Sequence, residues 1–281
     1  MLPQDLALER LNALIDRVAE RQRLDFGQLE SESKADGSLI TACDRWSDAT
    51  LVAGLAEIFP GEGVLSEEGD QSVPASAAYW VVDPLDGTTN FAAGIPFWAI
   101  SIARFEQGVP VLAVLDVPPL RQRLVAIRGQ GAWRNGKPIA QPSARNQVAG
   151  CASLCSRSIG VLQKLPQRRF PGKIRLLGVA SLNLVSVALG QTVAALEATP
   201  KIWDLAAAWL FLSELGCPLR WLLRDPALLE PGTNLTSTDY PVLAARNEAT
   251  LARFLPWGEA LVAPDCALEG FIQVPEPTPL D

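Results

Sequence analysis

The sequence predicts an α/β protein in which helices cover an antiparallel sheet in the first half and strands alternate with helices in the second half. Residues 5–22 carry apolar side chains at helical spacing, and the apolar runs at 98–105 and 109–116 flank a Gln-Gly turn, as in a β-hairpin. In the second half, short apolar runs alternate with longer segments of helical period. These observations predict two parts, 1–145 and 146–281, that together form one continuous unit.

The first sixty residues predict two amphipathic helices separated by a turn. In the first helix, apolar residues from Leu11 to Val18 follow the i, i+3, i+4, i+7 rule. A second apolar stripe over 51–59 predicts another helix, which Pro60 should end because proline lacks the N–H that a helix interior needs. The segment KADGSLIT at 34–41 lies between them and is turn-like.

Short apolar runs after residue 78 predict the strands of the first sheet. We expect these strands at 79–83, 98–105, 109–116 and 123–128. Asn135-Gly136 follows them and is a strong hairpin signal, so the antiparallel pattern should continue through it.

The second half predicts three strands and three helices. We expect strands at 174–179, 192–197 and 241–247, and helices at 181–189, 203–216 and 249–255. Gly216 should end the second of these helices, and the proline-rich tail VPEPTPLD should be mobile.

The segment 176–196 carries no charge over 21 residues, which is long enough to span a bilayer. Its serines, asparagine, glutamine, threonine and glycines dilute the apolar run. A buried helix followed by a core strand is therefore the favoured interpretation.

Composition excludes several classes of protein. The chain has 281 residues, of which 48% are hydrophobic, so it can bury a large core and is not low-complexity disorder. Its net charge of -7 and pI near 4.8 leave no basic footprint for nucleic acid. The chain has no histidine, which excludes Ser-His-Asp triads, Cys-His dyads and HExxH zinc sites. Any catalyst must use carboxylates, hydroxyls, lysines, thiols or a metal.

The cysteines and the first residues indicate a cytoplasmic protein. Among the five cysteines only Cys151 and Cys155 are close in sequence, which suits small buried side chains in a reducing compartment. The first ten residues already contain acids, unlike a secretory signal peptide.

Two aspartates follow the predicted strand at 79–83, in the sequence DPLDGTTN. Asp83 and Asp86 can point at one spot, where a cation would relieve their repulsion, and oxygen ligands of this kind favour Mg²⁺. Gly87 permits close approach of a phosphate, and the successive N–H groups of Gly87-Thr88-Thr89 can form an anion nest. This pattern predicts adjacent metal and phosphate sites. The alternative is an ordinary Asp-Gly turn.

Three further acids strengthen the metal interpretation, and two of them have structural alternatives. Glu67 lies in the segment SEEG, directly after a short apolar run. Asp204 opens the predicted helix 203–216, where an acid also favours the helix dipole. Asp44 precedes the second helix and could equally be only its N-cap.

Together these segments closely resemble the inositol monophosphatase family. The resemblance rests on KADGS at 34–38, TACD at 41–44, SEEG at 66–69, DPLDGTTNF at 83–91 and WDLAA at 203–207, in this order. It covers residues from about 30 to 247, and VLAARN near 242 is similar to a late strand of the family. Two features depart from the family: the helix that starts at Trp203 closes with ELGC in place of EAGG, and 150–175 shows no likeness.

The resemblance implies a layered α-β-α-β-α sandwich with an antiparallel N-terminal sheet and a mixed C-terminal sheet. It implies hydrolysis of sugar-like phosphate monoesters with two or three Mg²⁺ ions, inhibition by Li⁺, and a homodimer. The implied metal ligands are Glu67, Asp83, Asp86, Asp204 and the backbone carbonyl of Leu85.

The resemblance also implies roles around the substrate. Glu67 and Thr88 would position a water made nucleophilic by the metal, with the Thr88 hydroxyl held by Asp44. The implied substrate contacts are Asp86, Gly87, Thr88, Ala180, Glu197, Asp204 and Lys34, with Glu197 as the acceptor of substrate hydroxyls. The alternatives are a solvated surface lysine for Lys34 and an exposed strand-end acid for Glu197.

Inositol monophosphate is the leading substrate expectation, because a carboxylate at position 197 discriminates for polyol hydroxyls. The alternatives with the same chemistry are fructose 1,6-bisphosphate, histidinol phosphate and 3′-phosphoadenosine 5′-phosphate. An alternative of another class is an inactive phosphate-binding or scaffold protein. Neither nucleic acid nor membrane is expected as a partner.

Overall fold

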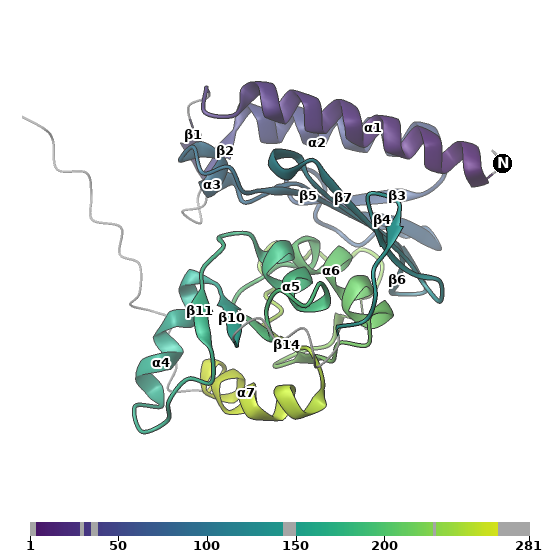
Figure 1. The fold of residues 1–281 in the computed structure, drawn as a ribbon. Helices are drawn as coiled ribbons and strands as arrows, with labels where there is room; N and C mark the ends of the chain where they lie inside the picture. Colours follow the sequence, from purple (N-terminus) through teal and green to yellow (C-terminus); the bar gives the residue numbers. More distant parts are fainter. Residues whose placement is uncertain (1–3, 29–30, 35–38, 143–149, 227–228, 264–281) are drawn as a thin grey trace, which may run out of the picture.

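The computed structural model describes residues 4–28, 31–34, 39–142, 150–226 and 229–263, which form alternating layers of helices and sheets (Figure 1). Helices α1 (Gln4–Asp25) and α2 (Ala42–Ile58) cover one face of a seven-stranded sheet. Helices α5 (Ala180–Ala188) and α6 (Ile202–Glu214) separate this sheet from a five-stranded one, and α7 (Glu248–Leu261) packs on the far face. The layered α/β fold implied by the sequence is confirmed.

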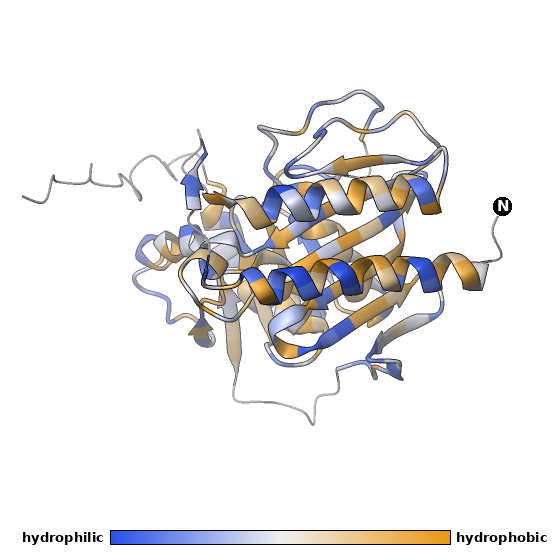
Figure 2. Ribbon diagram, turned by 90° about the horizontal axis from the view of Figure 1, so that it is seen from above, coloured by the Kyte–Doolittle hydropathy of each residue, from blue (hydrophilic) through white to orange (hydrophobic). Residues whose placement is uncertain are grey.

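Helices α1 and α2 lie side by side on the sheet (Figure 2). Leu11 and Ile15 of α1, together with Leu51 and Leu55 of α2, are buried in a cluster with Trp80 of the sheet. Their burial removes apolar surface from water, which is the main force that holds this outer layer in place. Both predicted helices are confirmed.

Helix α2 begins well before its apolar stripe because Thr41 caps it. The Thr41 hydroxyl accepts hydrogen bonds from the backbone N–H groups of Cys43 (3.2 Å) and Asp44 (3.4 Å), and the Asp44 carboxylate accepts one from Thr41 N–H (2.8 Å). Asp44 is therefore the third residue of the helix, and the alternative that it is the N-cap was wrong.

The seven-stranded sheet takes all its strands from the first half of the chain. Its order is β3-β4-β5-β6-β7-β8-β9, with bounds Gly63–Ser66, Ala78–Asp86, Ala99–Glu106, Val109–Val117, Gln122–Ile127, Gly131–Arg134 and Lys137–Pro138. Neighbouring strands are antiparallel, as predicted, except that the edge strand β3 is parallel to β4. The connection 67–77 brings the chain back to the end where β3 began, as a parallel pair requires.

Both predicted hairpin turns use left-handed backbone conformations. Gln107 and Gly108 have φ angles of 52° and 78°, and Asn135 and Gly136 have 49° and 75°. Two successive positive φ angles are typical of type I′ turns, whose twist matches that of the flanking strands.

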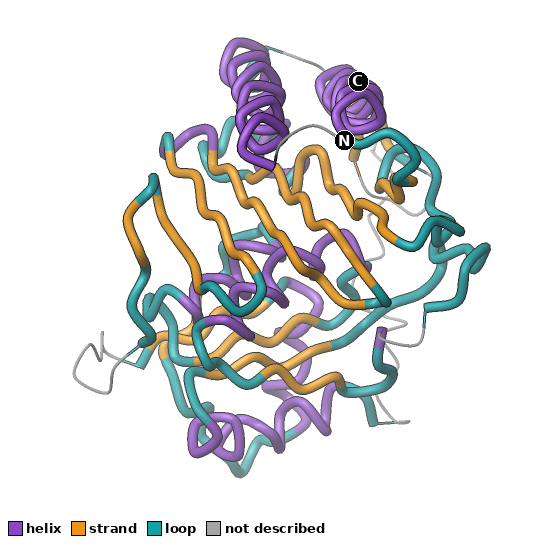
Figure 3. Tube along the Cα trace, turned by 90° about the vertical axis from the view of Figure 1, so that its right-hand side faces the viewer, coloured by secondary structure: helices purple, strands orange, loops and turns teal. Residues whose placement is uncertain are grey.

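The five-stranded sheet is mixed, as expected. Its order is β11-β10-β12-β14-β13, with bounds Lys173–Arg175, Cys151–Leu154, Ala194–Glu197, Val242–Ala245 and Leu219–Trp221. Strand β10 is parallel to both neighbours, whereas β14 is antiparallel to both of its own. Figure 3 shows this sheet stacked beneath the first, with helices between the two.

Helix α6 is buried between the sheets, where Leu205, Leu210 and Phe211 join the largest apolar cluster. A helix that is apolar on all sides is expected in such a position. The uncharged segment 176–196 forms a turn, α5 and β12, as the sequence favoured. Among the described residues, no helix is both long and apolar enough to cross a membrane.

The expected strand at 174–179 is wrong over its second half. Only β11, which ends at Arg175, pairs with a neighbour. Gly178 has a φ of 73° and Val179 is the N-cap of α5, so the chain leaves the sheet to start the helix. The region 155–164 holds a 3₁₀ turn (η2, Ser156–Gly160) and the short helix α4 (Val161–Lys164).

Some expectations lie outside the described residues. These are the turn at Asp36-Gly37 and the tail beyond residue 263. The division into 1–145 and 146–281 stays a prediction.

Candidate active site

Three aspartates meet where β4 ends and α6 begins. One carboxylate oxygen from each of Asp83, Asp86 and Asp204 lies within 4.8 Å of the other two. Asp83 and Asp86 are buried, and Asp204 is half-buried. The structure therefore brings together three of the acids that the sequence singled out.

A β-bulge puts Asp83 and Asp86 on one side of the sheet. Side chains alternate along a strand, so residues three apart normally face opposite ways. Asp83 and Asp86 pair with Ser101 and Ala99 of β5, so three steps along β4 match two along its partner. The extra residue resets the alternation. Pro84, which has no N–H to donate, sits within this irregular stretch, as proline in a sheet usually does.

Two helix N-termini hold the aspartates in place. Asp86 accepts hydrogen bonds from the N–H groups of Ala180 (3.2 Å) and Ser181 (2.7 Å) in the first turn of α5. Asp204, in the first turn of α6, accepts one from Lys201 N–H (2.7 Å). Helix N-termini favour negative charge, so the structural explanation of Asp204 holds alongside its place in the cluster.

Thr88 links α2 to the turn after β4. It opens the short helix α3 (Thr88–Ala92), whose N-cap is Gly87 with a φ of 103°. The Thr88 hydroxyl donates a hydrogen bond to Asp44 Oδ1 (2.7 Å) and also lies 3.1 Å from the carbonyl oxygen of Leu85. Asp44 thus holds the helix start with one oxygen and the Thr88 hydroxyl with the other.

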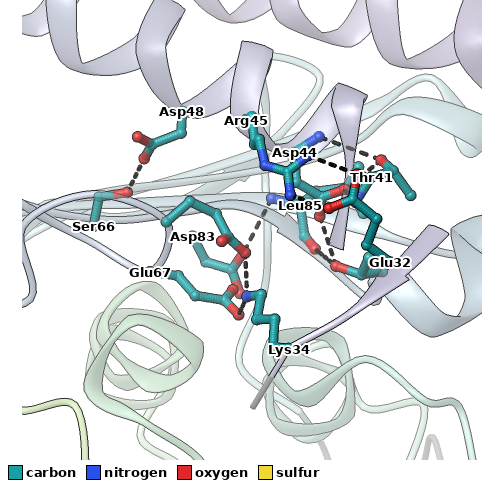
Figure 4. Close-up of polar contacts among 12 residues, drawn as sticks. Glu32, Lys34, Thr41, Asp44, Arg45, Asp48, Ser66, Glu67, Asp83 and Leu85 are labelled. Atoms are coloured by element: carbon teal, nitrogen blue, oxygen red, sulfur yellow. Dashed lines mark hydrogen bonds and ion pairs between the residues drawn. The ribbon is translucent and has the colours of Figure 1, made fainter. Parts of the chain in front are cut away.

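Glu67 lies beside Asp83 and contacts Lys34 (Figure 4). A two-stranded ribbon, β1 (Ser31–Ser33) and β2 (Leu39–Thr41), precedes α2, and Lys34 directly follows β1. Lys34 Nζ lies 3.1 Å from Glu67 Oε1 and donates a second, short hydrogen bond to Glu68 Oε1. The Lys34 side chain is 23% exposed, so the alternative of a solvated surface lysine was wrong.

The acids carry negative charge that their surroundings do not neutralise. Burial, reinforced by Glu67, Asp86 and Asp204, raises the pKa of Asp83 well above its usual range. Burial, Asp86 and Glu67 do the same for the pKa of Asp204. Carboxylate oxygens that converge at this spacing and repel one another fit a hard divalent cation. The residues present therefore suit Mg²⁺.

Burial and the charge of Glu67 also raise the pKa of Glu68, to about 7, although Lys34 opposes the shift. Burial opposes the charged form of Lys34, yet Glu67 and Glu68 together raise its pKa above the usual value. The ammonium is therefore charged throughout the neutral range.

These pKa shifts predict how pH and Mg²⁺ affect stability. A carboxyl whose pKa is raised on folding binds more protons in the folded state, so its contribution is full below pH 4 and is lost as pH rises through the raised pKa. For Glu68 and Glu197 the pKa values of about 7 and about 8 place this loss between roughly pH 5 and 8. We expect the melting temperature of the metal-free protein to fall across this range, and Mg²⁺ to raise it most at pH 8. A melting temperature that is independent of Mg²⁺ at pH 8 would contradict this account.

Glu197 lies at the end of β12 and is 2% exposed, so it is not the exposed strand-end acid of the alternative. Asn183 of α5 donates a hydrogen bond from Nδ2 to Glu197 Oε1 (2.7 Å). Burial raises the pKa of Glu197 to about 8, against the hydrogen bonds from Asn183 and Cys155, and the charge of Asp86 adds to the shift.

Sequence reasoning missed two amides near the site. Asn183 is a buried amide in a mostly apolar helix that also buries Ser181 and Ser186, and this was the available signal. Asn90, in the DGTTNF segment, donates from Nδ2 to the carbonyls of Phe97 and Leu177, both at 2.9 Å. It thereby ties the turn after β4 to the loop that leads into α5, and nothing in its spacing signalled this.

Comparison with known proteins relates this chain to phosphatases. The model of the inositol monophosphatase family matches residues 5–252. A histidinol-phosphatase of Mycobacterium tuberculosis is 35% identical over 218 residues, which cover 73% of this chain and 83% of that protein. An inositol-1-monophosphatase of Mesorhizobium japonicum is 34% identical over 227 residues, with the same coverage of both chains.

A solved structure shares the fold as well. It is that of an inositol monophosphatase/NADP phosphatase complexed with Mg²⁺ and phosphate. It is 26% identical, has a TM-score of 0.73, and the match covers 90% of this chain and 96% of that one.

Proposed function

Because the chain belongs to the inositol monophosphatase family of phosphatases, we propose that it is a Mg²⁺-dependent phosphomonoesterase whose substrate is inositol monophosphate. The observation that supports it most is the cluster of Asp83, Asp86 and Asp204 beside the Thr88 hydroxyl. A cluster of carboxylates next to an oriented hydroxyl and a glycine turn suits an enzyme that brings water to a phosphate ester.

We propose that the site holds two or three Mg²⁺ ions. Their ligands would be Asp83, Asp86, Asp204, Glu67 and the Leu85 carbonyl. When bound, these ions would neutralise phosphate charge and lower the pKa of water. The carboxylates provide oxygen donors on fixed elements, and two of them are held by helix N-termini.

The remaining residues would position the reactants. Thr88, whose hydroxyl is oriented by Asp44, would place the attacking water together with Glu67. Gly87 and Thr88 would offer backbone N–H groups to the phosphate, and Gly87 permits the left-handed turn that presents them. Ala180 would line the pocket beside Asp86, to which its N–H group is bound.

Glu197 supports a polyol over a cationic substrate. With a pKa of about 8, its carboxyl is mostly neutral at pH 7, so it can both donate to and accept from hydroxyl groups. A neutral carboxyl is a weak partner for the ammonium group of histidinol phosphate. Because one relative is a histidinol-phosphatase, inositol 1-phosphate and histidinol phosphate are the two substrates to compare first.

Glu197→Gln should separate the two substrate classes. Glutamine also donates and accepts, so we expect kcat/KM for inositol 1-phosphate to fall by only about tenfold, the value of one imperfect hydrogen bond. Phosphate release at saturating Mg²⁺ would measure kcat/KM for inositol 1-phosphate and for histidinol phosphate. If Glu197 bound an ammonium, histidinol phosphate would be the better substrate of the wild type, and only that activity would collapse in the variant.

One assay series tests the proposed function. It compares phosphate release from inositol 1-phosphate, fructose 1,6-bisphosphate, histidinol phosphate and 3′-phosphoadenosine 5′-phosphate, with Mg²⁺ and with added Li⁺. We expect Mg²⁺-dependent turnover that is highest on inositol 1-phosphate and inhibited by Li⁺. No turnover on any of the four would favour the inactive phosphate-binding protein.

We further propose that the protein works as a cytoplasmic homodimer that binds no nucleic acid. The net charge of -7 supports the last point, and the free thiols of Cys43, Cys155 and Cys217 suit a reducing compartment. Light scattering after size exclusion should give twice the chain mass of 30.2 kDa, and a monomer mass would contradict the dimer.

A further inference from the structure

Lys34 makes the closest cationic contact to the acid cluster among the described residues. Its ammonium lies 3.1 Å from Glu67 Oε1 (Figure 4). It also donates a short hydrogen bond to Oε1 of the adjacent Glu68. The Glu68 side chain is only 6% exposed, whereas those of Lys34 and Glu67 are each 23% exposed. The contact is therefore partly shielded from solvent, and charges that are shielded from water interact strongly.

The two carboxylates differ in their distance from the rest of the cluster. Glu67 raises the pKa values of both Asp83 and Asp204, so its charge lies close to theirs. Glu68 is instead bound to Lys34, whose ammonium donates a short hydrogen bond to Glu68 Oε1. Glu67 thus belongs to the acid cluster, and Glu68 stands behind Lys34 as its second anchor.

We propose that Lys34 is an internal counter-ion that competes with a divalent cation for Glu67. When the cation binds, the Lys34 ammonium leaves Glu67 and remains paired with Glu68, which is its resting place. This inference rests on the proposed function only in taking Glu67 as a metal ligand. An ammonium and a divalent ion on the same carboxylate repel each other at short range. The Lys34–Glu67 ion pair must therefore break before the Glu67 carboxylate can coordinate the metal. The charge of Glu68 then compensates the displaced Lys34 ammonium.

The chain offers a matched control for the loss of one positive charge. Arg45 of α2 pairs with Glu32 (Nη2 to Oε2, 2.5 Å), and its charge is felt by both Asp44 and Glu68. Among the described residues, Arg45 makes no contact with Glu67. Arg45→Gln therefore changes the net charge near the site by the same amount as Lys34→Gln, but it leaves the ion pair on the Glu67 carboxylate intact.

The test is direct titration of the substrate-free, metal-stripped protein with Mg²⁺ by calorimetry, at fixed pH and ionic strength. We expect Lys34→Gln to lower the Mg²⁺ dissociation constant by about tenfold, and Arg45→Gln to lower it by no more than about twofold. Circular dichroism melting of each variant confirms that it is folded. Equal effects of the two variants would overturn the competition and leave only general electrostatics.

A double-mutant cycle tests the role of Glu68 separately. Glu68→Gln should weaken Mg²⁺ binding in the wild type, because Lys34 then keeps only Glu67 as a partner. The same change should have a clearly smaller effect in the Lys34→Gln background, where there is no ammonium to withdraw. Additive effects would overturn the resting-place role. A wild-type protein that binds no Mg²⁺ would overturn the proposed function as well, whereas normal binding that Lys34→Gln leaves unchanged would overturn this inference alone.

Discussion

Replacing Asp83 with asparagine should abolish Mg²⁺-dependent phosphatase activity, with a loss in kcat/KM of roughly 10³-fold or more. The amide keeps the size of the side chain but removes the charge that a divalent cation needs. Asp83 is 1% exposed and lies among Glu67, Asp86 and Asp204, all of which raise its pKa.

The same substitution should stabilise the metal-free protein. At a pH above the raised pKa of Asp83, Asp83→Asn removes a buried, repelled charge, so the melting temperature without Mg²⁺ should rise while the shift on adding Mg²⁺ shrinks. Loss of activity with a gain in stability is the signature of a binding residue, because replacing a purely structural acid would lower both the activity and the stability of the protein. Wild-type turnover in this variant would contradict the metal assignment.

Asp116→Asn provides the matched control on β6. Asp116 is 6% exposed, as buried as the cluster acids, but it pairs with Arg123 (2.8 Å). Its loss leaves the half-buried Arg123 guanidinium with the exposed Asp16 as its remaining carboxylate partner, so the melting temperature should fall and Mg²⁺-dependent turnover of the folded fraction should persist.

Replacing Gly87 with alanine should damage both the fold and the activity. Gly87 has a φ of 103°, and a Cβ built there would lie 2.8 Å from Val179 Cγ2. We expect a loss of roughly 1–3 kcal/mol in the free energy of unfolding from backbone strain, plus the cost of the contact. Turnover should also fall steeply, because Thr88 is the next residue and its position follows the turn.

Gly94→Ala separates strain from contact. Gly94 also has a positive φ, 72°, but nothing lies within 4 Å of a Cβ there. Denaturant unfolding should therefore show a smaller loss for this variant than for Gly87→Ala. Val179→Ala should partly rescue Gly87→Ala by opening space. Equal losses at Gly87 and Gly94, without rescue, would show that the Val179 contact is unimportant.

The sequence predicted most of the fold because its elements are locally encoded. The helical stripe at Leu11 to Val18 and the Asn135-Gly136 turn depend on neighbours along the chain, and both are confirmed. The parallel pairing of β3 depends on where a distant strand lies, so local pattern could not show it. The predicted strand at 174–179 stops pairing after Arg175, and Gly178 turns the chain into α5 through a positive φ that a glycine permits but does not require.

Glu67, Asp83 and Asp86 were recognisable because they follow apolar runs, which deliver them to the edge of a sheet, whereas Asp204 opens an apolar helix. Their relative orientation was not, since three-residue spacing in a regular strand would place Asp83 and Asp86 on opposite faces. Only the bulge in the pairing with β5 resolves this. The partners of Lys34 were also beyond the sequence, because Glu67 and Glu68 lie more than thirty residues away along the chain.

The absence of histidine limits how the site can work at neutral pH. No imidazole is available to take up a proton, so under the proposed function carboxylates, the Thr88 hydroxyl and bound cations would carry the chemistry. The pH profile of kcat/KM should therefore reflect metal binding and carboxyl groups.

The acid cluster is proposed to make this protein a Mg²⁺-dependent phosphatase. The decisive measurement is phosphate release from inositol 1-phosphate by the metal-stripped wild type, before and after addition of Mg²⁺. We predict no release without Mg²⁺, release when it is added, and none again when a chelator removes it. Release that is equal with and without Mg²⁺, or a folded protein that releases none at saturating Mg²⁺, would contradict the claim.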